Sequence, residues 1–304
     1  MSDNPTLPGT HLGAVRLTDW GVIRASGADA RSFLHGQLTQ DVLHLQPGQA
    51  RLAGYCSAKG RLLASFVVWV DDGGDLLLAC SADLLPAVHK RLSMFVLRAK
   101  CKLTDATAEL PLWGVAGHPD QAPALAVWAT GAWSGATLVR LPDAPQEGGS
   151  TERYLWTGTA SPPLPALDVD TWRWLEVLSG VPRIAAPTVE QFVPQMVNLE
   201  LVGGVNFQKG CYPGQEVVAR SQYRGTLKRR AYVIHADAPL VAGQEIFSRA
   251  DPGQPAGMVV LAGRNSALAE LKIAAAEAGD LQAGPEGASL RLGPLPYALP
   301  TDHA

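Results

Sequence analysis

The residues most able to do chemistry lie in one stretch of the chain, residues 206–230, with the sequence NFQKGCYPGQEVVARSQYRGTLKRR. Between positions 209 and 230 this stretch contains six basic residues and one acid, Glu216, in a protein of formal net charge −3. The basic residues are Lys209, Arg220, Arg224, Lys228, Arg229 and Arg230. Such a concentration of positive charge can attract an anion or activate a nucleophile beside it.

The candidate nucleophile is Cys211, in the run KGCYPG. A helix is expected to begin near Pro213, which would place the sulfur close to a helix N-terminus. Helix N-termini and nearby cations both favour the thiolate, the form in which cysteine attacks electrophiles. The alternative is that Cys211 packs in the core as a small apolar residue, as most single cysteines do. The residues alone leave both interpretations open.

The remaining chemistry-bearing residues give weaker patterns. Cys56, Cys80 and Cys101 lie in strand-like apolar runs and are expected to be core residues. The cysteines form no CxxC pair and no two histidines are spaced i, i+4, so we expect no metal site. The chain has no GxGxxG, P-loop or GxSxG motif, which argues against dinucleotide binding, nucleotide binding and serine-hydrolase chemistry.

The elements that must position Cys211 are short strands with a few helices. Residues 51–70 are strand-like, and the turn at 71–74 leads directly into the apolar run DLLLAC, which predicts an antiparallel meander. Apolar residues at near-helical spacing over 82–98 predict an amphipathic helix on that sheet. A second helix is expected at about 171–179, before Gly180.

After Lys228 the pattern changes to short β-runs separated by turns, which predicts a small closed or sandwiched β-domain. The predicted fold class is therefore α+β. With 304 residues, 47% of them apolar, the chain is long enough for two or three domains and can form a large core. A pI near 6.2 argues against a broad nucleic-acid-binding face. The N-terminus has no secretory pattern and no apolar run approaches about 20 residues, so we expect a cytoplasmic protein without a membrane partner.

The stretch around Cys211 also carries a family resemblance. Residues 209–216, KGCYPGQE, resemble the signature of the YgfZ family of bacterial folate-binding proteins, in the superfamily of the aminomethyltransferase (T-protein) of the glycine cleavage system. Further runs match in the same order along nearly the whole chain, with a weaker middle between about 105 and 165. They are LTDW (17–20), GQLTQDV (36–42), AKGR (58–61), FVPQMVNL (192–199), GGVNF (203–207) and PLPY (294–297).

The resemblance implies a ring-like, multidomain aminomethyltransferase-type fold. Two α+β segments with antiparallel sheets and a C-terminal β-barrel would surround a central opening for a tetrahydrofolate-type ligand. The implied domains are a discontinuous α+β folate-binding core of residues 1–49 and 107–228, a second α+β domain of residues 50–106 and a barrel of residues 229–304.

The resemblance also implies a function: a folate-binding accessory factor for maturation or repair of iron–sulfur proteins, including tRNA-thiolating enzymes, acting through Cys211. Tetrahydrofolate or a derivative would be the cofactor, iron–sulfur enzymes the clients, and tRNA involved only indirectly. Trp20 and Trp172 take the places of two tryptophans linked to folate in the family, and indole stacks well on a flat pterin or aminobenzoyl ring. Their alternative role is core packing. The motif residues expected to support Cys211 are Lys209, Gly210, Tyr212, Gly214, Gln215 and Glu216.

Two departures from the superfamily bear on activity. Aminomethyltransferases carry an acidic pair on the strand after the AKG-like turn, and the comparable positions here, Ala64 and Ser65, offer no carboxylate. We therefore expect no classical aminomethyl transfer. The superfamily also has a pterin-side Glu where this chain has Leu178. Glu176 lies two residues earlier, about 200° around a helix, so we expect that it cannot take that place.

Two further functions stay open on the residues. One is a folate-dependent aminomethyl or methyl transferase, against which the missing acid argues. The other is an RNA-binding module that uses the basic stretch 209–230. The same stretch would equally attract the anionic glutamate tail of a folate.

Overall fold

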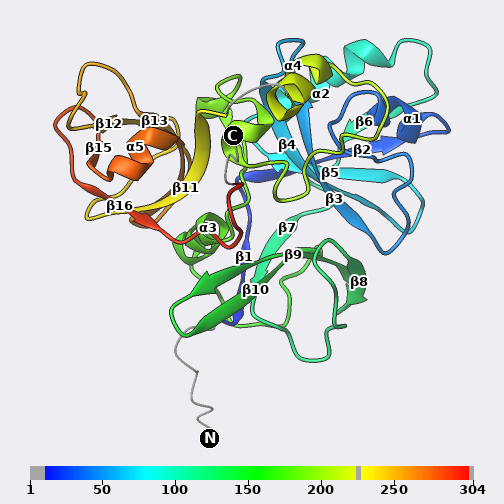
Figure 1. Cartoon of the computed structure of the whole chain (residues 1–304). Helices are drawn as coiled ribbons and strands as arrows, with labels where there is room; N and C mark the ends of the chain where they lie inside the picture. The colour runs from blue at the N-terminus through cyan, green and yellow to red at the C-terminus, as the bar shows by residue number, and fades with distance from the viewer. Residues whose placement is uncertain (1–10, 224–226, 301–304) are drawn as a thin grey trace, which may run out of the picture.

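Three antiparallel β-structures and a central helix make up the fold (Figure 1). The structure is a computed structural model, and it describes residues 11–223 and 227–300. Every pair of neighbouring strands within the three sheets runs antiparallel. The α+β class predicted from the sequence is confirmed.

The first sheet has the strand order β3-β4-β5-β2-β6. Its strands are Trp20–Ser26 (β2), Ala50–Cys56 (β3), Leu62–Val70 (β4), Leu76–Ser81 (β5) and Lys102–Asp105 (β6), with the helices Ala30–His35 (α1) and Leu85–Val96 (α2). Consecutive residues of β4 alternate between two cores, with Phe66 in one and Val67 in the other. The strand is continuously apolar because both faces of this sheet are covered.

The second sheet has the order β1-β7-β10-β9-β8. Its strands are Gly13–Arg16 (β1), Leu112–Ala116 (β7), Thr130–Trp133 (β8), Ala136–Gln146 (β9) and Gly149–Thr157 (β10). The pairing of β10 with β9 shifts register between Thr151 and Arg153. Such a β-bulge changes the direction of the side chains that follow it.

The third sheet forms a nearly closed C-terminal barrel with the order β15-β12-β13-β14-β11-β16. Its strands are Arg229–Ala236 (β11), Glu245–Ser248 (β12), Gly257–Gly263 (β13), Ser266–Lys272 (β14), Leu281–Ala283 (β15) and Leu290–Gly293 (β16), with the helix Ile273–Ala278 (α5). An isolated bridge between Gln282 and Ser289 links the two end strands. The predicted C-terminal β-domain is thereby confirmed.

The helix Val169–Leu178 (α3) lies between the barrel and the second sheet (Figure 1). It contacts β13 and β14 on one side and β9 and β1 on the other. The Asp168 carboxylate accepts a hydrogen bond from the Thr171 backbone N–H at 3.0 Å, which caps the first turn. The remaining helical elements are Ala186–Thr188 (η1), Pro194–Val197 (η2) and Gln215–Tyr223 (α4).

The predicted division into domains stays a prediction. β2, within the segment 1–49, hydrogen-bonds to β5 and β6 from the segment 50–106. No helix in residues 11–223 and 227–300 is long and apolar enough to cross a membrane.

Candidate functional site

A cavity lies where the first two sheets meet the segment that follows α3. Its aromatic and apolar wall comes from Trp20 on β2, Leu52 on β3 and Phe66 on β4. Its charged wall comes from Arg153 on β10, Glu176 on α3 and Arg183. The cavity therefore combines flat apolar surface with both signs of charge, an arrangement suited to a polar aromatic ligand.

Glu176 and Arg183 form a buried, two-point ion pair in the cavity wall. The Arg183 guanidinium donates from Nε to Glu176 Oε1 at 3.2 Å and from Nη2 to Oε2 at 3.3 Å. A further bond of 3.0 Å runs from Nη2 to Asp19 Oδ2. Burial alone would lower the pKa of Arg183, but the Glu176 and Asp19 carboxylates outweigh it and raise that pKa. Arg183 is therefore a permanent cation that fixes the Glu176 carboxylate.

Arg153 is the second buried guanidinium of the cavity, with 3% of its surface exposed. Burial lowers its pKa to about 10, although the Glu176 charge acts against that effect. Its guanidinium carbon lies 4.9 Å from the centre of the Trp172 ring. The one side-chain hydrogen bond that Arg153 makes among the described residues is a long one, 3.4 Å from Nη1 to the Pro142 carbonyl.

The two tryptophans expected to bind folate have different surroundings. Trp20 lines the cavity, with the Arg183 guanidinium carbon 4.9 Å from its ring centre. Trp172 is 1% exposed, does not line the cavity and lies behind Arg153. A Cβ added to Gly114 would lie 2.5 Å from the Trp172 ring, so β7 packs directly on the indole. Trp20 is placed to touch a ligand, and Trp172 is placed to support Arg153.

α3 offers the cavity a carboxylate from Glu176, at a different place on the helix from Leu178. Leu178 faces a different cluster, with Ala116 and Leu295, whereas Glu176 faces the cavity. Residues four apart share a helix face, so Glu176 follows Trp172 toward the interior. On β4, Ala64 is buried and the Ser65 hydroxyl accepts a hydrogen bond from the Ile184 backbone N–H at 3.0 Å.

The inner cavity is narrow and adjoins a wider groove. The inner volume is about 30 Å³, and a single water needs about 10–15 Å³. The groove has a volume of about 510 Å³ and includes Leu201 and Tyr297 in its wall. Trp128 and Pro142 line both spaces. Trp128 and Pro142 therefore lie at the boundary between the inner cavity and the groove.

Cys211 lies outside this cavity, on an exposed loop. α4 begins at Gln215, four residues later, which agrees with the helix start expected near Pro213. Tyr212 is buried in the largest core cluster and anchors the loop. Glu216 projects from the first turn of α4 and pairs with Arg220 at 3.3 Å. The structure thus keeps the motif residues together but does not bring Cys211 into the cavity that Trp20 lines.

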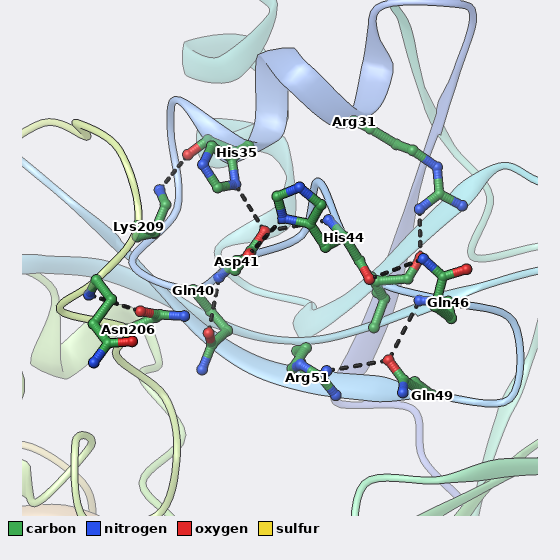
Figure 2. Close-up of polar contacts among 12 residues, drawn as sticks. Arg31, His35, Gln40, Asp41, His44, Gln46, Gln49, Arg51, Asn206 and Lys209 are labelled. Atoms are coloured by element: carbon green, nitrogen blue, oxygen red, sulfur yellow. Dashed lines mark hydrogen bonds and ion pairs between the residues drawn. The ribbon is translucent and has the colours of Figure 1, made fainter.

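Lys209 fastens the Cys211 loop to the end of α1 (Figure 2). Its ammonium donates to the carbonyls of His35 and of Leu38, the latter at 2.7 Å. His35 is the last residue of α1, and a cation is favourable at the carbonyl end of a helix. Burial lowers the pKa of Lys209 to about 8, against the opposing effects of Asp41 and Cys211.

An acidic and imidazole cluster lies beside this loop (Figure 2). Asp41 Oδ1 is 3.1 Å from His35 Nδ1, and Asp41 Oδ2 is 2.8 Å from His44 Nδ1. A Cβ on Gly210 would lie 3.7 Å from His35 Nε2. The backbone immediately before Cys211 therefore lies in ordinary contact range of the His35 ring.

The turn at 57–60 packs against the other side of the motif. Gly214 has φ +78°, and a Cβ there would lie 2.4 Å from the Ser57 carbonyl oxygen and 2.6 Å from Gly60 Cα. Gly60 has φ +70° and faces Val217 of α4 in the same way. Glycine is needed at both positions because of the left-handed backbone and the close approach.

Internal partners hold four of the six basic residues of the stretch 209–230, including Arg220, which pairs with Glu216. Arg230 is buried against Glu200, and Arg229 donates to Glu270 Oε1 at 2.8 Å. Lys209 is bound to α1 as described above, and Arg224 lies outside the described residues. The stretch therefore stabilises the junction between α4 and the barrel more than it presents a free basic face.

Sequence reasoning missed most of the cavity. Arg153, Arg183 and Trp128 are single residues in unremarkable local patterns, and they meet only through the fold. The runs GQLTQDV and AKGR did indicate segments that matter, since both lie against the Cys211 loop. Among the described residues no group of three or more His, Cys, Asp or Glu side chains is arranged to hold a metal ion.

Comparisons with known proteins agree with one another. The tRNA-modifying protein YgfZ of Edwardsiella ictaluri is 32% identical to this chain, covering 98% of the chain and 97% of that protein. The tRNA-modifying protein YgfZ of Klebsiella pneumoniae is 30% identical, covering 95% and 94%. No family model matches. The crystal structure of glycine cleavage system aminomethyltransferase T from Bartonella henselae superposes with a TM-score of 0.67 at 15% identity, covering 95% of this chain and 86% of that one. The expected aminomethyltransferase-type fold is therefore confirmed.

Proposed function

The chain belongs to the YgfZ family, and on that premise we propose that it is a folate-related tRNA-modification factor. In the finer form of the proposal, it binds tetrahydrofolate and assists maturation or repair of iron–sulfur proteins, including enzymes that thiolate tRNA. Cys211 is the residue through which it acts. The family membership supports the first statement, and the two sites described above support the second.

The cavity supports a pterin ring as the bound part of the folate. Trp20 and Phe66 offer flat apolar surface, on which a pterin can stack. Each carboxylate oxygen of Glu176 receives one bond from Arg183 and retains the capacity to accept another. The 2-amino group and N3–H of a pterin are donors that suit these oxygens. Trp128 turns aside to admit the ring, and the wider groove takes the remainder of the ligand.

The observation that carries the proposed role of Cys211 is its exposure outside the cavity. Cys56 and Cys80 are buried and Cys101 is half-buried, whereas Cys211 is exposed. A thiol that is open to solvent can reach a group on another protein, and a thiol in the folate cavity could not. This arrangement suits an accessory factor that acts on client proteins.

Aminomethyl transfer is the weaker candidate. It needs an acid–base group beside the folate nitrogens, and neither Ala64 nor Ser65 supplies one. Glu176 does line the cavity, but its two bonds to Arg183 suit ring binding better than proton transfer. Incubation with the aminomethylated carrier protein of glycine cleavage and tetrahydrofolate should release no ammonia above background. Sustained turnover would make transfer the better assignment.

The test of the proposal is complementation of a bacterial strain that lacks this gene. Cys211→Ser and Cys211→Ala should fold and bind tetrahydrofolate, but they should fail to restore the activity of an iron–sulfur enzyme that thiolates tRNA. The matched control is Cys101→Ser, at a half-buried cysteine, which should restore that activity. The melting temperature of each variant is measured alongside. Full rescue by either Cys211 variant would contradict the proposed role.

A further inference from the structure

Arg153 is distinguished by its lack of an anionic partner. The described residues include four buried arginines, and three have a carboxylate within 4 Å: Arg140 with Asp143, Arg183 with Glu176 and Arg230 with Glu200. Arg153 forms no such pair, although it is 3% exposed. A buried charge without a partner is costly, and proteins rarely retain one. An acceptor for the unpaired donors of Arg153 is therefore expected in a ligand.

The free donors of Arg153 belong to the cavity. Its Nε has no hydrogen-bond partner among the described residues, and Nη1 makes only the 3.4 Å contact with Pro142. The Arg153 guanidinium packs on the Trp172 ring, and Arg153 comes directly after the β-bulge in β10. Arg153 lines the same cavity as Glu176 and Trp20. The fold thus holds a rigid fork of donors in a site with a carboxylate acceptor.

We propose that Arg153 donates to the 4-oxo group of the bound pterin and makes the site selective for 4-oxo over 4-amino pteridines. This inference rests on the proposed folate binding and names the residue that reads the ring. The pyrimidine edge of a 4-oxo pterin carries two donors, the 2-amino group and N3–H, followed by one acceptor, the C4 carbonyl. Glu176 accepts from the donors and Arg153 donates to the carbonyl. A 4-amino group places a donor against Arg153, where two donors repel.

The experiment measures the affinity of three ligands by tryptophan fluorescence and calorimetry: tetrahydrofolate, its 4-amino-4-deoxy analogue and 6-methyltetrahydropterin, which has no glutamate. The wild-type protein should prefer the 4-oxo over the 4-amino compound by about 10- to 100-fold, the range for a buried hydrogen bond to a charged group. Arg153→Met should lose most of this preference and should weaken binding of 6-methyltetrahydropterin as much as that of tetrahydrofolate.

Stability gives a second readout that a structural arginine would not share. Because the ligand-free protein buries an unpaired charge at position 153, Arg153→Met should melt at or above the wild-type temperature without ligand and gain less from tetrahydrofolate. Arg153→Lys keeps the charge but not the fork, and it should also lose selectivity. The matched control is Arg24→Met, on β2 outside the cavity, which should keep the wild-type preference.

Each outcome decides the assignment. Unchanged selectivity in folded Arg153→Met or Arg153→Lys overturns it. A loss confined to tetrahydrofolate, with 6-methyltetrahydropterin unaffected, means that Arg153 binds the glutamate carboxylate instead. If neither pterin binds the wild-type protein, the proposed folate binding fails together with this inference. If Arg153→Met does not fold, the selectivity of Arg153→Lys decides alone.

Discussion

Burial separates Cys211 chemically from the other three cysteines. It raises the pKa of Cys56 to about 12 and that of Cys80 to about 12. Burial also raises the pKa of Cys101, to which the nearby Asp29 charge adds. The reactive form is the thiolate, so the raised pKa makes these three thiols less reactive near neutral pH than a free cysteine. Cys211 alone is exposed to a reagent in solution.

The first prediction is that iodoacetamide modifies Cys211 and spares the other cysteines in the native protein at pH 7.5. Peptide mass spectrometry identifies the modified residue. All four cysteines should react once the protein is unfolded in guanidinium chloride. Modification of Cys56 or Cys80 at a comparable rate in the native state would show that the buried thiols open readily to solvent.

Two histidines make the stability of the fold sensitive to acid. Burial lowers the pKa of His35, with the Lys209 charge acting in the same direction. Burial and Arg291 lower that of His235, whose Nδ1 lies 2.9 Å from the Ser266 hydroxyl. Below the usual histidine pKa of about 6.5, the unfolded chain binds protons that the folded protein does not. The contribution of these two histidines to stability is complete above about pH 6.5, and it is lost as the pH falls toward their lowered pKa values in the folded protein.

The second prediction is that the free energy of unfolding in urea decreases between pH 7.5 and pH 5.5. His235→Asn removes one of the titrating groups, so the decrease should be smaller in that variant. Measurements at both pH values on the two proteins give the comparison. An equal decrease in wild type and His235→Asn would show that His235 does not contribute.

At the scale of elements, the Cys211 loop is held between two others. The ammonium of Lys209 ties it to the end of α1, and Gly214 fits against the turn at 57–60. The motif KGCYPGQE therefore specifies a docked loop as well as a thiol. The glycines and the lysine of this motif hold the loop in place and thereby position Cys211.

The third prediction concerns Gly214→Ala. The left-handed backbone costs a non-glycine residue about 1–2 kcal/mol, and the added methyl group meets the Ser57 carbonyl at 2.4 Å. Gly279→Ala is the control, because Gly279 has φ +72° and no atom within 4 Å of the added carbon. Gly214→Ala should lose more stability than Gly279→Ala and should increase amide exchange in α4. Equal losses of stability in the two variants would mean that the turn at 57–60 shifts to accommodate the added methyl group without a free-energy penalty.

At the scale of the whole molecule, the cavity exists because separate sheets meet. Trp128 joins two of them through its backbone: its N–H donates to the Arg140 carbonyl at 3.0 Å, and its carbonyl accepts from the Ala50 N–H at 2.8 Å. Trp128 also has φ +64°, a left-handed conformation that is rare for a bulky residue. Trp128 lines both the inner cavity and the outer groove.

The fourth prediction is that Trp128→Ala accelerates tetrahydrofolate association. The smaller side chain widens the boundary between the outer groove and the inner cavity, so a pterin ring can enter more easily. Stopped-flow fluorescence measures the rate, and Trp113→Ala, at a tryptophan outside both spaces, controls for the loss of one of the eight fluorophores. An association rate equal to that of wild type would mean that the ligand enters by another route.

The sequence by itself determined the local elements and the family. Periodicity predicted helices at 82–98 and 171–179, and the structure has them at 85–96 and 169–178. The short runs after Lys228 predicted the C-terminal β-structure, and the motif KGCYPGQE indicated the YgfZ family. These features depend on neighbours within a few residues, which is why they can be read along the chain.

The tertiary structure alone decided what the cavity contains. Trp172 lies behind Arg153 and does not line the cavity. Glu176 faces the cavity, whereas Leu178 does not, and Cys211 lies on an exposed loop outside the cavity. The direction of the Arg153 side chain depends on the β-bulge that precedes it in β10. The direction of the Glu176 side chain depends on how α3 is rotated between the barrel and the second sheet. Local periodicity does not specify these directions, because they are set when distant segments pack against one another and exclude water.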